Sequence, residues 1–285
     1  MTLEEILELP VDQLNKLSGV GIRLFPDVAN MMEYMARSMA DEIRANNEQG
    51  KPTRWILPVG PVKQYFRLLE ISHQERICWS QVHIFMMDEF LDWQGRPLPL
   101  NHPFSFEGFM RHQVFEKLDP ALGFAADRVV FPSPFRPDEI SERIQAVGGI
   151  DTCYGGIGYH GHVAFNEPPI SRWYRITPQE MRESKTRVVV LGDDSIVVQS
   201  INCAGGSSAS VPPMAVTLGM RDILQSRHIR MFLAGGERHR AVFRITCLGD
   251  QTTDYPSTFL QGHPDCVIHT VEATARPIIS SQVWG

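Results

Sequence analysis

Short apolar segments alternate with segments of helical periodicity along this chain of 285 residues. Apolar residues recur at helical spacing in 25–50, 137–149 and 237–249, and each of these segments ends at a glycine. The intervening apolar runs have the length of buried strands, and they lie at 54–60, 82–89, 152–158, 187–192, 228–236 and 266–272. Buried strands separated by helices predict an α/β fold, with a mostly parallel sheet covered by helices on both faces.

Composition narrows the class of protein. The hydrophobic content of 43% suits one large core or two modest ones, and no internal repeat or linker divides the chain. Residues 91–108, rich in Pro, Gly and aromatics, are expected to form a long ordered loop. The net charge of −6 gives no general electrostatic case for binding nucleic acid or an anionic membrane, although a small basic pocket stays possible.

Cysteine usage and the N-terminus indicate the compartment. The five cysteines are scattered and form no C-x-x-C pair, so neither a disulfide framework nor a structural zinc site is indicated. The acidic, amphipathic N-terminus does not resemble a secretory signal, and no apolar stretch is long enough to span a bilayer. We therefore expect a cytoplasmic protein.

Polar and glycine residues follow several of the predicted strands. Gly60, Asp88 with Glu89, the segment 155–167 and the segment 235–238 each come directly after an apolar run. Ligands of open parallel sheets bind beyond the carboxyl ends of the strands, so these positions are expected to converge. Each has a simpler interpretation, because Asp88 alone would serve equally well as a helix cap and the glycines as turn residues.

The stretch GGIGYHGHVAFNEP, residues 155–168, places His160 and His162 on either side of Gly161. Three interpretations compete: packing, a metal site, and acid-base chemistry on a small molecule. Two histidines at this spacing could share a metal in extended backbone, but a catalytic metal needs a third protein ligand. No further His or Cys stands at a suggestive spacing, and Glu167 has another explanation, so we expect no metal.

That explanation is a resemblance. GGIGYHGHVAFNEP resembles the glucosamine-6-phosphate deaminase (isomerase) signature G-G-x-G-x-D-G-H-I-A-F-N-E-P. The segments FMMDEFLDW, NHPFSFEGFMRHQVFEKLD, VPPMAVTLGM, LAGGERHRAV and YPSTFLQGHPDCVI also look like family segments, in the same order. The resemblance runs from about residue 21 to about residue 275, and it is expected to mark residues 21–285 as one domain with 1–20 as an added N-terminal helix.

The resemblance implies a single Rossmann-like domain and a reaction without cofactor. An amino-sugar phosphate is opened, isomerised and hydrolysed to a ketose phosphate and ammonia. By position, Asp88 matches the base that moves the proton between C2 and C1, His162 matches the group that moves a proton at the ring oxygen, and Glu167 matches its partner. A histidine suits this step because its usual pKa is near neutrality. Family members often assemble into oligomers, so a homo-oligomer is expected.

Two departures from the family pattern bear on the mechanism. His160 stands where the family has Asp, and it is counted as a catalytic residue with Asp88, His162 and Glu167. Its presence predicts a lower pKa for His162 than in the family. The turn around Gly60 lacks the family's threonine and is shorter, so the binding of the sugar phosphate must differ.

The residues expected to bind the anionic sugar substrate are Gly60, Lys63, Gly156, Gly158, Arg187 and Arg238. Arg238 matches the family's phosphate-binding lysine. The unusual segment 203–210 either helps to bind the sugar phosphate or is only a surface loop.

Two alternatives to an isomerase-deaminase stay open. One is hydrolysis of a sugar-phosphate lactone, as in the related 6-phosphogluconolactonases, where the histidine would activate water without a C2 base. The other is a non-catalytic sugar-phosphate sensor that has lost turnover together with the Asp.

Overall fold

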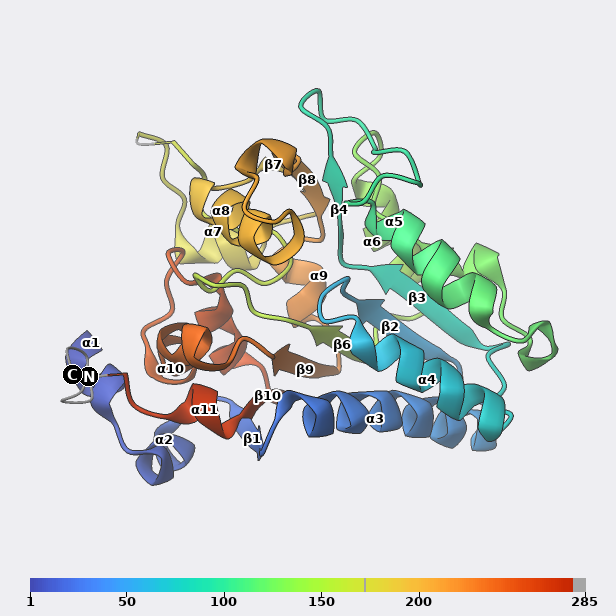
Figure 1. Cartoon of the computed structure of the whole chain (residues 1–285), viewed down its shortest axis with the longest axis horizontal. Helices are drawn as coiled ribbons and strands as arrows, with labels where there is room; N and C mark the ends of the chain where they lie inside the picture. Colours follow the sequence, from blue (N-terminus) through green and yellow to red (C-terminus); the bar gives the residue numbers. More distant parts are fainter. Residues whose placement is uncertain (172, 279–285) are drawn as a thin grey trace.

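The central sheet of this computed structural model, which describes residues 1–171 and 173–278, has seven strands in the order β1-β10-β9-β6-β2-β3-β5 (Figure 1). Every neighbouring pair is parallel, as the alternation of strands and helices predicts. The strands are β1 (Gly21–Phe25), β2 (Thr53–Leu57), β3 (Val82–Met86), β5 (Val129–Val130), β6 (Thr152–Gly155), β9 (His228–Leu233) and β10 (Cys266–Val271).

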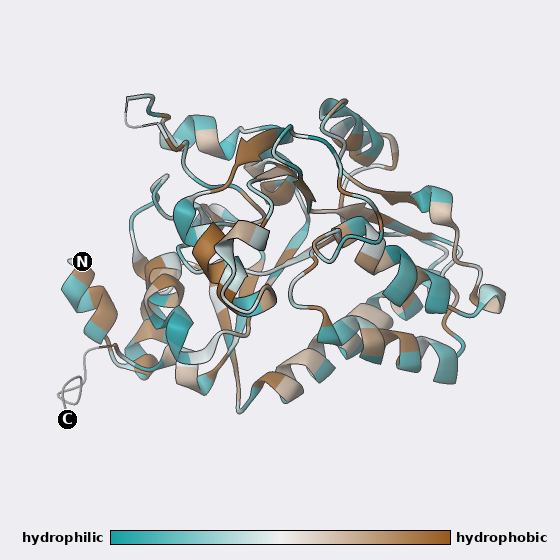
Figure 2. Cartoon of the chain, turned by 45° about the horizontal axis from the view of Figure 1, so that its top comes forward, coloured by the Kyte–Doolittle hydropathy of each residue, from teal (hydrophilic) through white to brown (hydrophobic). Residues whose placement is uncertain are grey.

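Helices cover both faces of this sheet. On β2, Trp55 and Leu57 pack with α3 and α4, whereas Ile56 points to the other face, where α6 and α10 lie. These helices carry both teal and brown segments in Figure 2, as expected for helices with one buried face. The expected α/β class with two covered faces is confirmed. The longer helices are α3 (Val28–Glu48), α4 (Lys63–Gln74), α6 (Asp138–Ala146), α8 (Asp193–Cys203) and α10 (Arg240–Leu248).

A second, three-stranded sheet stands beside the first, and it was not expected. Its antiparallel strands are β4 (Asp88–Leu91), β8 (Met214–Thr217) and β7 (Arg187–Val190), in that order. The strand predicted at 187–192 is therefore real but belongs to this sheet. Its side chains alternate between partly buried and exposed, with Val188 and Val190 facing solvent, because only one face of this edge strand is covered, whereas β4 is buried throughout.

The segment predicted as one strand at 82–89 passes from one sheet to the other at Met87. The Met87 N–H donates to the carbonyl of Leu57 in the large sheet, and its carbonyl accepts from the N–H of Leu218, next to β8. Asp88 consequently becomes the first residue of β4, at the point where the two sheets diverge. This break positions the predicted base.

Residues 92–105 connect β4 to α5 with neither helix nor strand, as expected for the loop. The remaining helices are short: α1 (Leu3–Glu8), α2 (Val11–Leu17), α5 (Phe106–Phe109), α7 (Pro178–Arg182), α9 (Met220–Leu224) and α11 (Glu272–Ala275).

The first 20 residues contain two helices in place of the single helix expected. Leu9 is extended, as is typical before a proline, and Pro10 caps the second helix. The fully buried guanidinium of Arg244 on α10 connects this segment to the far end of the chain. It donates to the carbonyls of Ile6 and Leu9 on one side, and to those of Ala275 and Arg276 on the other.

Candidate active site

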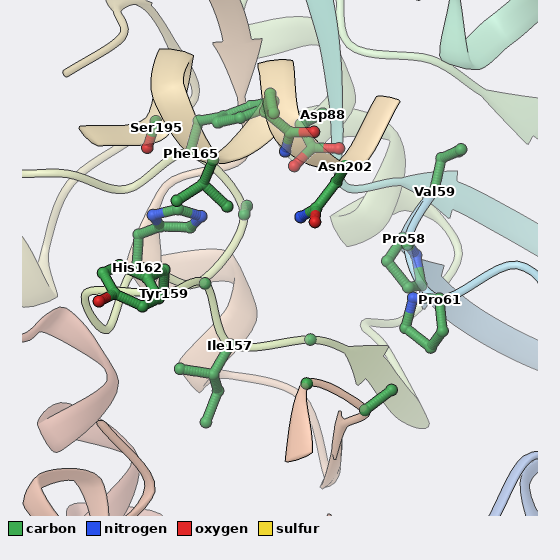
Figure 3. A pocket seen from close by; sticks show the side chains of 18 of the residues that line it. Pro58, Val59, Pro61, Asp88, Ile157, Tyr159, His162, Phe165, Ser195 and Asn202 are labelled. Atoms are coloured by element: carbon green, nitrogen blue, oxygen red, sulfur yellow. The ribbon is translucent and has the colours of Figure 1, made fainter. Parts of the chain in front are cut away.

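A cavity of about 360 Å³ lies beyond the carboxyl ends of β2, β6 and β9. Three loops that follow these strands line it, together with the start of β4 and one side of α8. Figure 3 shows Asp88, His162 and Asn202 around one part of this space, and Pro58 and Pro61 across from them. The predicted site residues that line the cavity are Gly60, Asp88, Gly156, Gly158, His160, His162 and Arg238.

Asp88 lies at the base of the cavity and is only 7% exposed. Burial raises the pKa of Asp88 to about 8, and the charge of the neighbouring Glu89 adds to the effect. A carboxyl group with a pKa near neutrality can both accept and return a proton under ordinary conditions. Its position and its pKa therefore suit the proton transfer expected of it.

Glu89 points to the other side of β4 and does not line this cavity. Its carboxylate accepts hydrogen bonds from the backbone N–H groups of Phe106 and Glu107, at 2.9 and 2.6 Å, where α5 begins. Burial raises the pKa of Glu89 to about 7, although these N–H groups oppose the shift. Glu89 thus anchors the loop 92–105 to the strand that carries Asp88.

His160, His162 and Glu167 form a compact cluster, here called the triad. The Nδ1 atom of His162 lies 3.4 Å from Nε2 of His160 and 3.4 Å from Oε1 of Glu167. The separation of His160 Nε2 and Glu167 Oε1 is 3.9 Å. Both imidazoles line the cavity, whereas Glu167 lies behind them, buried.

Burial lowers the pKa of His162 to about 3, and the nearby His160 and His239 contribute to the shift. The direction agrees with the prediction made from the His160 substitution, but the larger cause is loss of solvent. His162 is therefore an uncharged imidazole at neutral pH, and its protonated form is scarce.

Glycines shape the loop that carries the two histidines. Gly161 has a φ of +87°, a conformation that side chains other than glycine rarely adopt, and it turns the chain between the imidazoles. A Cβ atom at Gly158 would lie 1.9 Å from Nε2 of His162, so the imidazole occupies the space that a side chain would need. Gly158 therefore makes room for His162.

Glu167 is held in place by α8. Its Oε2 accepts from the backbone N–H of Gly192 at 2.8 Å, and Oε1 accepts from the hydroxyl of Ser195. Both groups belong to the start of α8, where an anion is favoured by the helix dipole. The position of Glu167 is thus fixed independently of the histidines.

Two residues expected to bind substrate are not at the cavity. Lys63 is the first residue of α4; its side chain is exposed and does not line the cavity. Arg187 donates to the side-chain oxygen of Asn166 at 2.8 Å, and the amide of Asn166 donates to the carbonyls of Val163 and Leu218. Arg187 therefore stabilises the turn before Glu167 and does not reach the cavity.

Arg238 is at the rim, exposed, with a 3.3 Å contact from its guanidinium to the side-chain oxygen of Asn202. Beside it, His239 lines the cavity, and burial lowers its pKa to about 4, with the charge of Arg238 contributing. Residues 203–210 are mostly exposed and do not line the cavity.

Sequence reasoning missed the contribution of α8, which supplies Ser195, Gln199 and Asn202 to the cavity wall, and it also missed His239. The only signal for His239 was its place after Arg238 in a segment that follows a strand. In the described part of the chain, no helix is both long and apolar enough to cross a membrane.

Several curated proteins are similar to this chain along most of its length. The chain is 31% identical over 220 residues to the glucosamine-6-phosphate deaminase of Caenorhabditis elegans, covering 75% of this chain and 76% of that protein. It is 30% identical over 262 residues to the glucosamine-6-phosphate deaminase of Parabacteroides distasonis, covering 89% of each. No protein-family model matches the sequence.

Solved structures show the same fold. A monomeric glucosamine-6-phosphate deaminase superimposes with a TM-score of 0.74 at 22% identity, covering 90% of this chain and 99% of that one. The 6-phosphogluconolactonase of Trypanosoma cruzi superimposes with a TM-score of 0.64 at 16% identity, covering 90% and 96%. The sequence identity to the two curated relatives, over at least three quarters of their length, shows that the chain belongs to the glucosamine-6-phosphate deaminase family.

Proposed function

We propose that this protein is an aldose-ketose isomerase and deaminase that converts an amino-sugar phosphate, with glucosamine 6-phosphate as the leading candidate, to a ketose phosphate and ammonia. The observation that carries the proposal is that Asp88 and His162 open onto one cavity, from different elements. A carboxyl group and an imidazole facing the same ligand supply the two proton transfers that this reaction needs.

Asp88 removes the proton from C2 of the opened sugar and delivers a proton to C1. Its raised pKa makes its carboxylate a stronger base than an exposed aspartate. The second proton transfer reverses the first at the adjacent carbon, so one carboxyl group serves both. This transfer leaves an imine at C2, and water hydrolyses the imine to the ketose phosphate and ammonia.

His162 donates a proton to the ring oxygen during ring opening. Its Nδ1 faces Glu167, a contact longer than a usual N–H···O hydrogen bond, and it faces His160 at the same distance. Because the pKa of His162 is about 3, the protonated imidazole is rare at neutral pH, and ring opening limits the rate.

The phosphate of the substrate is bound at the rim by Arg238, with the backbone around Gly60 and Gly235 beside it. An arginine grips phosphate through two parallel hydrogen bonds. Among the described residues that line the cavity, Arg238 is the only lysine or arginine, since Lys63 and Arg187 lie elsewhere. Phosphate binding therefore depends on this one side chain more than the resemblance implied.

One assay tests the proposal. The purified protein is incubated with amino-sugar phosphates, keto-sugar phosphates and a sugar-phosphate lactone, while ammonia release and deuterium exchange at C2 are followed. Ammonia and C2 exchange from an amino-sugar phosphate are expected. Lactone hydrolysis without C2 exchange would indicate the lactonase alternative, and tight binding without any turnover would indicate the sensor.

We also propose that the protein acts in the cytoplasm as a homo-oligomer without nucleic acid or membrane partners. All five cysteines are unpaired, which suits a reducing compartment. One similar solved structure is described as monomeric, so light scattering of the purified protein is the direct test of its oligomeric state.

A further inference from the structure

We propose that His160, His162 and Glu167 form a binding site for a divalent ion of the zinc type. The three donor atoms are His160 Nε2, His162 Nδ1 and Glu167 Oε1, and they lie within 4.8 Å of one another. In the described residues no other group of three such side chains meets this condition. The expectation of no metal rested on the lack of a third histidine or cysteine, and Glu167 supplies the third donor.

The spacing of the donors matches zinc coordination. Zn–N and Zn–O bonds of about 2.0–2.2 Å place two tetrahedral ligands about 3.3–3.6 Å apart. Two of the three separations are 3.4 Å, and the third is 3.9 Å. For a triangle of these sides, the equidistant point in the plane of the three atoms lies about 2.1 Å from each, which is the length of a zinc bond, so a bound ion lies close to that plane.

The same distances are poor for direct hydrogen bonds. N–H···O and N–H···N bonds of proteins cluster near 2.9–3.0 Å. The three atoms of the triad are 3.4–3.9 Å apart, so any hydrogen bonds between them are weak. The Nδ1 atom of His160 is buried and has no hydrogen-bond partner among the described residues. With the proton on Nδ1, the Nε2 lone pair is free for an ion, although Nδ1 then lacks the acceptor that a metal-ligating histidine usually has.

The triad is also held in advance of binding. Gly192 and Ser195 fix the carboxylate of Glu167, which corresponds to the outer-shell support that metal sites need. The exposed fractions of the side chains of His160, His162 and Glu167 are 22%, 13% and 6%. Both imidazoles line the cavity, so the cavity is the source of a fourth ligand, either water or a ligand oxygen.

The donor set selects the class of ion. Two imidazoles and one carboxylate favour Zn²⁺ over Mg²⁺ and Ca²⁺, which prefer oxygen ligands only. His160, which stands where the family signature has Asp, supplies the second imidazole. Bound zinc would occupy the His162 Nδ1 atom, so it is expected to inhibit turnover; this consequence rests on the proposed function, whereas zinc binding itself does not.

Zinc titration of the full-length chain tests the site. After dialysis against a chelator, the protein is titrated with Zn²⁺ by calorimetry, and the bound metal is counted after gel filtration. One zinc per chain is expected, with His160→Ala and Glu167→Gln each binding at least tenfold more weakly. His239→Ala is the matched control, because this imidazole lines the same cavity outside the donor set and its loss should change affinity less than twofold.

The proposed site would be wrong if His160→Ala bound zinc as tightly as wild type, or if His239→Ala lost as much zinc affinity as His160→Ala. The exposed Cys78 and Cys203 are present in every variant and so give a common background. Glu167→Gln also loses contacts to α8, so His160→Ala decides the case if the Gln variant fails to fold. The visible spectrum of bound Co²⁺ should be tetrahedral in wild type and absent in His160→Ala.

Activity measurements test the inhibition by zinc separately from zinc binding. Added zinc should inhibit the deaminase reaction, and chelation should restore it fully, since the proposed chemistry needs no metal. Activity lost on chelation and restored by zinc would overturn the inhibitory role and make the metal catalytic. If the protein shows no deaminase activity, the zinc and cobalt titrations still decide whether the site exists.

Discussion

The imidazoles of His160 and His162 meet edge to face, with ring centroids 4.9 Å apart and the facing nitrogens 3.4 Å apart. Two such groups disfavour each other's protonation, which adds to the effect of burial on the pKa of His162. In the family signature a carboxylate takes the place of His160. A single substitution at position 160 should therefore change the fraction of His162 that is protonated and able to open the ring.

His160→Asp should raise turnover on a cyclic amino-sugar phosphate. The new carboxylate raises the pKa of His162 from its low value, and each unit gives about ten times more protonated imidazole at neutral pH. The limb of the pH-rate profile that falls with rising pH should therefore move to higher pH. His160→Ala should act in the same direction but less, and steady-state kinetics from pH 5 to 9 measure both.

Loss of activity in a folded, ligand-binding His160→Asp variant would give His160 a catalytic role of its own. The same variant loses one nitrogen donor of the triad, so its zinc affinity should be measured in parallel.

Asp88→Asn should abolish deuterium exchange at C2 while leaving ligand affinity within a few-fold of wild type. The amide keeps the shape of the side chain and loses its basicity, so the rate should fall by about 10³ or more. Exchange is followed by NMR, and affinity by calorimetry with the ketose phosphate. Exchange at the wild-type rate would remove Asp88 from the mechanism.

The same variant should gain stability relative to wild type as the pH rises. The pKa of Asp88 in the folded protein, about 8, is above its unfolded value, so the stabilisation by its neutral form is lost as pH rises from about 4 to 8. The amide introduced by Asp88→Asn does not titrate, and the difference in free energy of unfolding should grow by roughly 1.4 kcal/mol per pH unit in this range. Urea unfolding at pH 5 and pH 8 measures it; a difference that does not depend on pH would show that Asp88 is not held in an apolar site.

Arg238→Ala should raise KM for the phosphorylated substrate with a smaller change in kcat. A charged hydrogen bond of about 1.5–3 kcal/mol corresponds to a loss of roughly 10- to 150-fold in kcat/KM. Lys63→Ala, which removes a cation that the structure places outside the cavity, should stay within twofold. The reverse ranking would indicate that phosphate binds near α4.

The parallel sheet could be predicted from the sequence, because six apolar runs separated by helical segments leave few other folds. The second sheet could not. The run at 187–190 reads as a buried strand. Its partner β8 lies about 30 residues further along the chain, β4 on the far side of β8 lies about 100 residues before it, and only tertiary packing shows that one face of β7 meets solvent.

The candidate site was also predictable only in part. The convergence of Asp88 with the segment that carries His160 and His162 was predicted because both follow strands, and strand ends fix where loops gather, whereas their roles came from the resemblance. Lys63 was expected at the cavity as a compensating charge and Arg187 from the resemblance, but Lys63 lies exposed at the start of α4 and Arg187 donates to the buried Asn166. Ser195 and Asn202 lie on α8, whose sequence carries no sign of what it packs against.

The hydrogen bonds of Arg244 bear on where this protein begins and ends as a folding unit. A buried guanidinium needs its acceptors, and here two come from residues 6–9 and two from residues 275–276. Removing residues 1–20 as an appendage would leave a buried charge with half its partners, and trimming the other end before Ala275 would do the same. Residues 6–9 and 275–276 are thus held together through one side chain, so a circular permutant whose new break lies in the exposed segment 203–210 keeps every contact of Arg244 intact.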